Sequence, residues 1–205
     1  MRFRILNKNP LYDYREACKI TQGIDLWQDL DIDKIFVPKD EVAFWIKQIV
    51  ANHSTIRSVK FRLEASAPKS VVMQIIRATK GHPQPFVESS RPDWKGKERS
   101  PDPYEEKMFI MDFTAESFVE MCKQRLCHRT EERTEKFVRE VVETLKRSDE
   151  PFLKAVGYCC RANCWWHGGR CPEIKSCLDD VRKVSNELIA IYEIDSAVRN
   201  RGDEE

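Results

Sequence analysis

Residues 56–79, IRSVKFRLEASAPKSVVMQIIRAT, contain the two patterns from which the fold can be read outward. In the first half apolar and polar side chains alternate, so that Val59, Phe61 and Leu63 share one face of an extended chain. This alternation is typical of a half-buried strand. In the second half Pro68 precedes apolar residues at spacings of one, three and four, which predicts a helix. The stretch therefore predicts a strand followed directly by a helix.

Periodic patterns on either side of this stretch predict further elements. Residues 1–6, MRFRIL, alternate like a short opening strand, and residues 108–113, MFIMDF, read as a short buried strand. Residues 38–52 carry apolar side chains at helical spacing and predict a helix. Thr114 is a suitable N-cap for another helix over residues 115–126, which has an apolar stripe.

The remaining regions are less regular. Residues 128–147 are dense in charge but supply the next buried helical face, after a break at residues 127–130. Residues 176–194 predict an amphipathic helix, and the polar residues after Asp195 are expected to fray. Residues 7–37 have no clean period, and no element is assigned to them.

Length and charge limit the classes of function. With 205 residues, of which 41% are hydrophobic, the chain can bury one good core, and we expect a single domain over residues 1–205. Thirty-five basic and 34 acidic residues leave a net charge of +1, so nothing global favours nucleic acid or a membrane surface as partner. No apolar run reaches the roughly 18 residues of a spanning helix, and the first residues lack a secretory core. We therefore expect a cytoplasmic protein.

A candidate anion site lies in residues 75–94, IIRATKGHPQPFVESSRPDW. Arg77 ends an apolar run, and Ser89, Ser90 and Arg91 cluster after a proline-broken loop. Two guanidinium groups with small hydroxyl donors suit an oxyanion with several acceptor oxygens, of which phosphate is the commonest. The alternatives are a solvated loop with ordinary turn residues and, for Arg77, a cation stabilised by the helix dipole.

Eight cysteines are present, and five of them fall between residues 159 and 177. In a reducing compartment they are thiols or metal ligands more often than disulfides. Four of them are spaced more loosely than the paired Cys-x-x-Cys knuckles of zinc sites: Cys159, Cys164, Cys171 and Cys177. Reduced thiols with packing roles are the favoured interpretation, and zinc or an iron–sulfur cluster, with His167 as a spare ligand, is the alternative.

The order of these segments resembles the flavin-dependent thymidylate synthases. The similarity covers roughly residues 50–178, from NHSTIRSVKFRLEASAPKSVVMQIIRAT through VESSR, and then from FTAESFVEMCKQRLCHRTEERTEKFVREVVETLK onward. Some members also have a tail like GGRCPEIKSC. The resemblance implies an α+β domain with an antiparallel sheet packed with helices. It also implies a homotetramer, in which neighbouring subunits build each nucleotide site.

The resemblance assigns nucleotide-binding roles to particular residues. Gln74 and Arg77 occupy the positions at which the family holds deoxyuridine monophosphate (dUMP) and the flavin edge. Ser89, Ser90 and Arg91 match the family's phosphate-binding turn. Phosphate is thus the implied anion of the candidate site.

Two further residues take roles from the same comparison. Arg125 matches the arginine that contacts the uracil ring and polarises it for attack at C5, which makes Arg125 the predicted catalytic residue. A fixed positive charge there would stabilise negative charge developing on a pyrimidine oxygen. The alternative for Arg125 is a surface pair with a carboxylate such as Glu132. Thr55 falls where the family touches flavin.

The implied reaction is transfer of a one-carbon unit from methylenetetrahydrofolate to C5 of dUMP, giving dTMP. FAD, reduced by NADPH, would provide the hydride. Where the family has Arg-His-Arg, this chain has Arg77-Ala78-Thr79, without two residues that grip the flavin. That departure suits a hydroxymethylating relative, in which water captures the methylene adduct on a uracil or cytosine nucleotide. A third hypothesis is a zinc-stabilised, non-enzymatic binding protein organised by the C-terminal cysteines.

Overall fold

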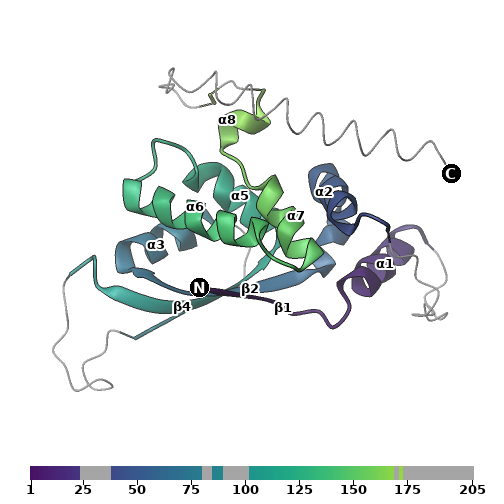
Figure 1. Ribbon diagram of the computed structural model, residues 1–205, viewed down its shortest axis with the longest axis horizontal. Helices are drawn as coiled ribbons and strands as arrows, with labels where there is room; N and C mark the ends of the chain where they lie inside the picture. Colours follow the sequence, from purple (N-terminus) through teal and green to yellow (C-terminus); the bar gives the residue numbers. More distant parts are fainter. Residues whose placement is uncertain (24–37, 80–84, 90–101, 169–170, 173–205) are drawn as a thin grey trace.

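The chain has an α+β fold in which helices cover one face of a four-stranded antiparallel sheet (Figure 1). A computed structural model describes residues 1–23, 38–79, 85–89, 102–168 and 171–172. The elements, in chain order, are β1 (Arg2–Ile5), α1 (Pro10–Thr21), α2 (Glu41–Ala51), the 3-10 helix η2 (Ser54–Ser58), β2 (Lys60–Pro68), α3 (Lys69–Ala78), β3 (Phe86–Val87), β4 (Glu106–Thr114), α5 (Ala115–Arg125), α6 (Glu132–Lys146), α7 (Pro151–Cys159) and α8 (Asn163–Trp166).

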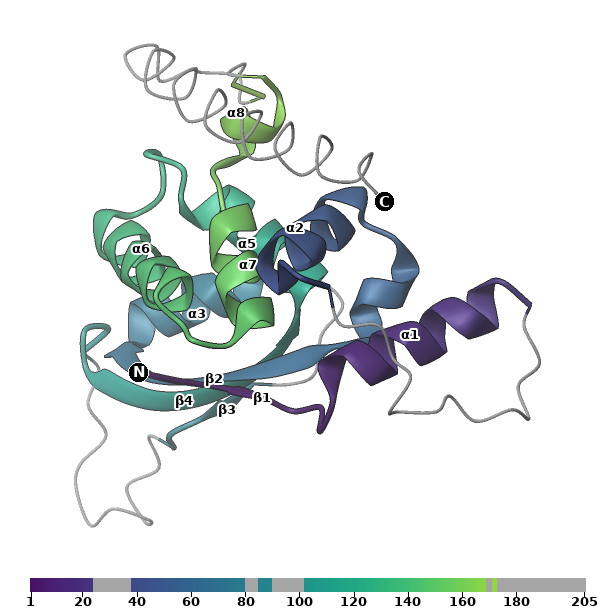
Figure 2. The same ribbon diagram turned by 45° about the vertical axis from the view of Figure 1, so that its right-hand side comes forward.

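The sheet has the strand order β1-β2-β4-β3. The long central pair sets its two faces, because Phe61 on β2 lies opposite Phe113 on β4, and Leu63 lies opposite Met111. These side chains are buried beneath the helices, whereas their polar neighbours point to the other face. Figure 2 shows α3, α5, α6 and α7 stacked on one side of the curved sheet, with α1 beside its end.

Aromatic rings join the helices to the sheet. Phe118 on α5 packs edge-on against Phe113, with ring centroids 5.0 Å apart, and lies 5.4 Å from Phe61. Trp45 on α2 meets Phe152 on α7 at 5.1 Å. These contacts hold α5 and α7 in fixed positions over the sheet, and α5 carries the predicted catalytic arginine.

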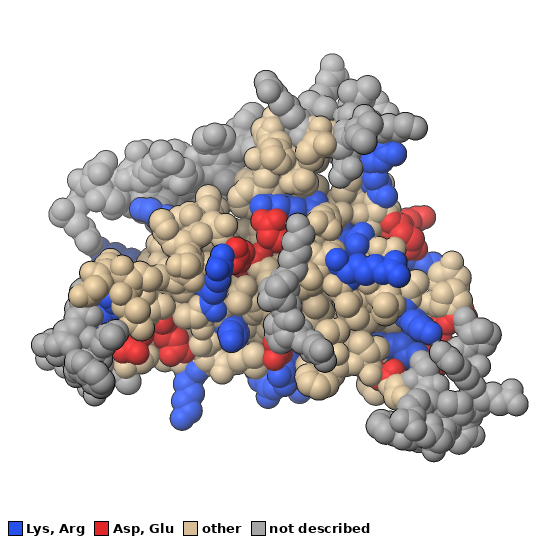
Figure 3. Space-filling model, turned by 180° about the vertical axis from the view of Figure 1, so that it is seen from behind, with Lys and Arg blue, Asp and Glu red and all other residues tan. Residues whose placement is uncertain are grey.

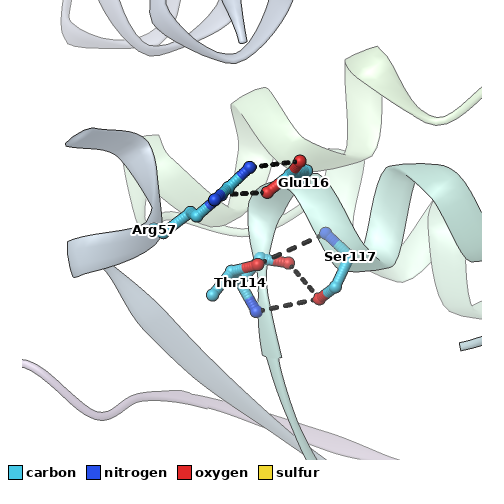
Figure 4. A network of polar contacts seen from close by, with 4 residues as sticks. All are labelled: Arg57, Thr114, Glu116 and Ser117. Carbon is cyan, nitrogen blue, oxygen red and sulfur yellow. Dashed lines mark hydrogen bonds and ion pairs between the residues drawn. The ribbon is translucent and has the colours of Figure 1, made fainter. Parts of the chain in front are cut away.

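The N-terminal end of α5 is held by a compact polar network (Figure 4). The hydroxyl of Thr114 accepts a hydrogen bond from the backbone N–H of Ser117, and Ser117 Oγ accepts one from the backbone of Thr114, which completes a capping box. Arg57 on η2 grips the carboxylate of Glu116 with two nitrogens, one of them at 3.0 Å. The start of α5 is therefore fixed from both β4 and η2.

Most of the predicted elements are confirmed. The strands expected at residues 1–6 and 108–113, and the helices expected at 38–52, 67–79 and 115–126, correspond to β1, β4, α2, α3 and α5. The helix expected within residues 128–147 is α6, after a break at the predicted place. No described helix has the length and apolarity needed to cross a membrane.

Three predictions need correction or fall outside the description. The strand expected from residue 56 begins only at Lys60, because Ile56 and Val59 close 3-10 turns with the carbonyls of His53 and Ile56. Residues 7–37, left without an element, contain α1, and α7 was also missed. The helix predicted over 176–194 and the tail after Asp195 lie outside the described residues.

Candidate functional site

Charge is distributed without one dominant sign. On the face seen in Figure 3, blue basic and red acidic side chains are interspersed among the described residues. This agrees with the net charge of +1. A charged ligand must therefore be recognised by a local group of side chains.

A polar pocket of about 540 Å³ contains such a group. Its walls come from α3, the end of α5, the turn between α5 and α6, α8 and the segment just after α8. Gln74 contributes from α3 and Arg125 from α5, while Arg129 and Glu131 contribute from the turn. The pocket thus gathers segments that are far apart in the sequence.

Arg125 is the central cation of this pocket. Its Nε donates a hydrogen bond of 3.0 Å to the backbone carbonyl of Gln74. Partial burial, and then the positive charge of Arg77, lower the pKa of the Arg125 guanidinium below its ordinary value. The positive charge of Arg77, whose side chain is exposed and outside the pocket wall, thus opposes that of Arg125. An arginine remains charged at any physiological pH, so this repulsion persists until an anion offsets it.

Neither guanidinium has a carboxylate partner among the residues that the structure describes. The alternative pairing of Arg125 with Glu132 is wrong, because Glu132 accepts a hydrogen bond from Lys136 Nζ at 2.6 Å instead. Arg77 lies in the last turn of α3, as the helix-dipole alternative also requires, and its side chain is exposed.

The acid nearest to Arg125 in the pocket wall is already engaged. Glu131 caps α6 by accepting hydrogen bonds from the backbone N–H groups of Arg133 and Thr134, at 3.2 and 2.9 Å. Burial alone would raise the pKa of Glu131, but hydrogen bonds from Thr134 and Arg133 outweigh it and hold that pKa below its usual range. The carboxylate therefore stabilises the helix start and leaves Arg125 without an acidic partner.

Lys123, another cation in the pocket wall, has two interaction partners of its own. Its Nζ pairs with Glu120 one turn earlier and lies 4.7 Å from the ring centre of Trp166. The cation–π contact joins α5 to α8 and helps to close that side of the pocket. Lys123 thus has a carboxylate and an aromatic partner, whereas Arg125 donates a hydrogen bond to a backbone carbonyl.

The structure brings together only some of the predicted site residues. Gln74 and Arg125 line the pocket, whereas Arg77 is exposed outside its wall and acts on Arg125 through its positive charge. Ser89 follows β3 at the edge of the sheet, where the N–H of Glu88 bonds to the carbonyl of Met108, and Ser89 is not in the pocket wall. Ser90 and Arg91 lie outside the described residues.

Thr55, the predicted flavin contact, lies at the opposite end of α5 from Arg125. It is buried on η2 with 7% of its surface exposed, and its hydroxyl contacts Tyr14. Because η2 meets the start of α5 through Arg57 and Glu116, nine residues of helix, or about 14 Å, separate that junction from Arg125. Thr55 therefore does not share the pocket with Gln74 and Arg125, and its contact with flavin stays a prediction.

The positions of the cysteines in the fold do not follow their spacing in the sequence. Cys159 is 3% exposed and belongs to the core, whereas Cys164 and Cys171 line the pocket, and Cys127 joins them from the turn after α5. Cys177 lies outside the described residues, and His167 is exposed at the end of α8. The described residues contain no group of three or more His, Cys, Asp or Glu side chains placed to hold a metal ion.

Sequence reasoning missed Arg129 and Cys127 as pocket residues. The available signal was the run KQRLCHR, residues 123–129, which places several cations and a thiol at a predicted helix break. No protein-family model and no curated protein matches this chain.

Proposed function

We propose that the pocket binds a pyrimidine nucleotide, dUMP in the first instance, and that the protein transfers a one-carbon unit from methylenetetrahydrofolate to C5 of its base. The observation that carries the proposal is Arg125, a guanidinium in the pocket wall that has no described carboxylate partner and whose charge is opposed by that of Arg77. Two such charges repel each other in the absence of ligand, and an anion between them relieves that repulsion.

The size and polarity of the pocket fit this ligand. Its volume of about 540 Å³ falls within the range of small-molecule sites, roughly 300–1,000 Å³. The side-chain amide of Gln74 offers one acceptor and two donors, which match the carbonyl and N–H groups along a pyrimidine edge. An amide can present either end, so Gln74 suits uracil and cytosine alike.

Arg125 has the proposed catalytic role. The hydrogen bond from its Nε to the carbonyl of Gln74 fixes the plane of the guanidinium before ligand arrives. Negative charge drawn onto an oxygen of the pyrimidine makes C5 nucleophilic toward the methylene carbon, and a fixed guanidinium stabilises that charge without reorganising. A lysine at this position would keep the charge but lose the planar fork.

The first candidate product is dTMP, with FAD as hydride donor and NADPH as its reductant. Because Thr55 lies at the far end of α5 from Arg125, we propose that the flavin site draws Thr55 and Arg77 from neighbouring subunits. That arrangement agrees with the homotetramer implied by the family resemblance. In this proposal nucleotide binding and activation of the base use Gln74, Arg77 and Arg125, and the flavin would supply only the hydride.

A specific observation favours the hydroxymethylated nucleotide as a second candidate. Ala78 is buried with 2% exposure, and Thr79 Oγ1 donates a hydrogen bond of 2.8 Å back to the carbonyl of Ile75. These residues stand where the family has the histidine and second arginine that hold flavin. Neither side chain replaces those contacts, which suits capture of the methylene adduct by water.

The experiment combines binding and product analysis. In calorimetric titrations of the full-length protein, dUMP should bind and deoxyuridine, which lacks the phosphate, should bind more weakly by about 10-fold or more. Tritium release from C5-labelled dUMP, with methylenetetrahydrofolate present, reports the reaction, and product mass separates methyl from hydroxymethyl. Stoichiometric zinc with no affinity for any pyrimidine nucleotide would overturn the proposal in favour of the zinc-stabilised binding protein.

A further inference from the structure

The seven cysteines in the described part of the chain fall into distinct environments. Three are packed in the core: Cys122, Cys159 and Cys160. Three line the pocket, and we call them the pocket thiols: Cys127, Cys164 and Cys171. Cys18 lies on α1, partly exposed and away from the pocket. The described cysteines that cluster in the sequence from residue 159 onward therefore include both core residues and pocket residues.

The core thiols are too deeply buried for reagents to reach them. Their side chains are at most 3% exposed, and burial raises the pKa of Cys159 and of Cys160 well above the ordinary value for a thiol. Because the thiolate is the nucleophile in exchange with a disulfide, both access and chemistry protect these residues. They serve as an internal control for any modification of the pocket.

The pocket thiols differ from the core thiols in access. Cys127 and Cys171 are only partly buried and open on the polar pocket. Cys127 is held in place, because its carbonyl accepts a hydrogen bond of 2.8 Å from the N–H of Thr130, and it follows Arg125 by two residues. Sulfur and guanidinium thus share one cavity of about 540 Å³.

This combination selects a particular class of reagent. A disulfide that carries carboxylates is attracted by the guanidinium groups, which match carboxylate geometry in a bidentate fashion. Oxidised glutathione is a peptide disulfide with several carboxylates, and it belongs to this class. A neutral disulfide lacks that attraction.

We propose that the nucleotide pocket is also a site of thiol–disulfide exchange with glutathione disulfide, at Cys127 first and Cys171 second. The attacking thiolate forms a bond to one sulfur of glutathione disulfide, the disulfide bond breaks, and one glutathione thiolate leaves and takes up a proton. The cysteine sulfur is oxidised and the departing sulfur is reduced. The bound tripeptide places carboxylates near Arg125 and excludes the nucleotide; this last step alone rests on the proposed function.

The test uses the wild-type full-length protein with glutathione disulfide and, in parallel, the neutral 2-hydroxyethyl disulfide. Intact mass and peptide mapping should locate the glutathione adduct at Cys127 or Cys171 and not at the core cysteines. For each reagent, the extent of modification of the pocket thiols is divided by that of Cys18. This ratio should be several-fold higher with glutathione disulfide than with the neutral reagent. Equal ratios for the two reagents, or preferential modification of Cys18, would overturn the inference.

Variants separate this inference from the proposed function. Cys127→Ser should lower the adduct yield, and Arg125→Gln should slow modification by glutathione disulfide but not by the neutral reagent. Inorganic phosphate should protect the pocket thiols if the cations attract the reagent, whether or not dUMP binds. Loss of dUMP affinity on modification, restored by a reducing agent, tests the regulatory step. Selective modification without any dUMP binding would retain the thiol site and defeat the nucleotide function.

Discussion

The arginines at the two ends of α5 differ in their partners and in the direction of their pKa shifts. At the first turn, Arg57 is bound by both oxygens of Glu116, and that hydrogen-bonded pair raises the pKa of the guanidinium. At the last residue, Arg125 contacts a backbone carbonyl only, and burial with the nearby charge of Arg77 lowers its pKa. The arginine at the start of the helix has a carboxylate partner, whereas the arginine at its end has no described carboxylate partner. The comparison teaches that the paired end stabilises the fold and the unpaired end is available to a ligand.

The largest effect on dUMP affinity is expected from reversing the charge at position 125. Arg125→Glu should reduce dUMP affinity by more than about 100-fold, because a charge-assisted hydrogen bond is lost and a carboxylate is placed beside the nucleotide phosphate. Calorimetric titration measures the change. Arg139→Glu on the exposed face of α6 is the matched control, and an equal loss there would indicate a general effect of charge.

The next effect tests the fold at the paired end. Thr114→Ala removes the hydroxyl that accepts from the N–H of Ser117, and the free energy of unfolding should fall by about 1 kcal/mol. Urea denaturation gives this value, while dUMP affinity measured below the transition should stay unchanged. A large loss of affinity in folded Thr114→Ala protein would mean that the two ends are not independent.

A smaller, pH-dependent effect is expected at Glu131. Its folded pKa is lowered by hydrogen bonds, so the stability it contributes is present above its unfolded pKa and is lost as pH falls through the folded pKa. Glu131→Gln should therefore be less stable than wild type at neutral pH and equal to it in acid. Denaturation curves at several pH values test this, and a constant difference at all pH values would exclude the carboxylate's charge as the cause.

The smallest effect is expected from Arg57→Ala. The pair with Glu116 lies at the surface, where solvent screens it, so stability should change little and dUMP affinity not at all. Thermal unfolding and titration of the same sample give both values. A marked loss of affinity in this variant would break the contrast between the two ends of α5.

Local patterns predicted β1, β2 and β4 and the helices with one apolar face, but they missed β3, α1 and α7. The apolar residues of α1, such as Leu11 and Tyr14, are separated by charged ones, so its period is weak. In α7 six of the nine residues are buried, Ala155 and Val156 among them, and none is exposed, so the helix has no exposed polar face to reveal its period.

The candidate site was only partly predictable for a related reason. Gln74 and Arg125 were named from residue patterns and family resemblance, but their contact depends on how α3 and α5 pack. Cys127 and Arg129 enter the pocket because the turn after α5 folds back toward α8, which no local pattern encodes. The division of the cysteines follows from tertiary burial in the same way.

The central claim is that Arg77 and Arg125 act together on one anion, and a double-mutant cycle tests it most directly. Titration of dUMP into wild type, Arg77→Ala, Arg125→Ala and the double variant should give single losses that do not add, with a coupling of about 0.5–3 kcal/mol. Strictly additive losses, or unchanged affinity in either single variant, would contradict the account.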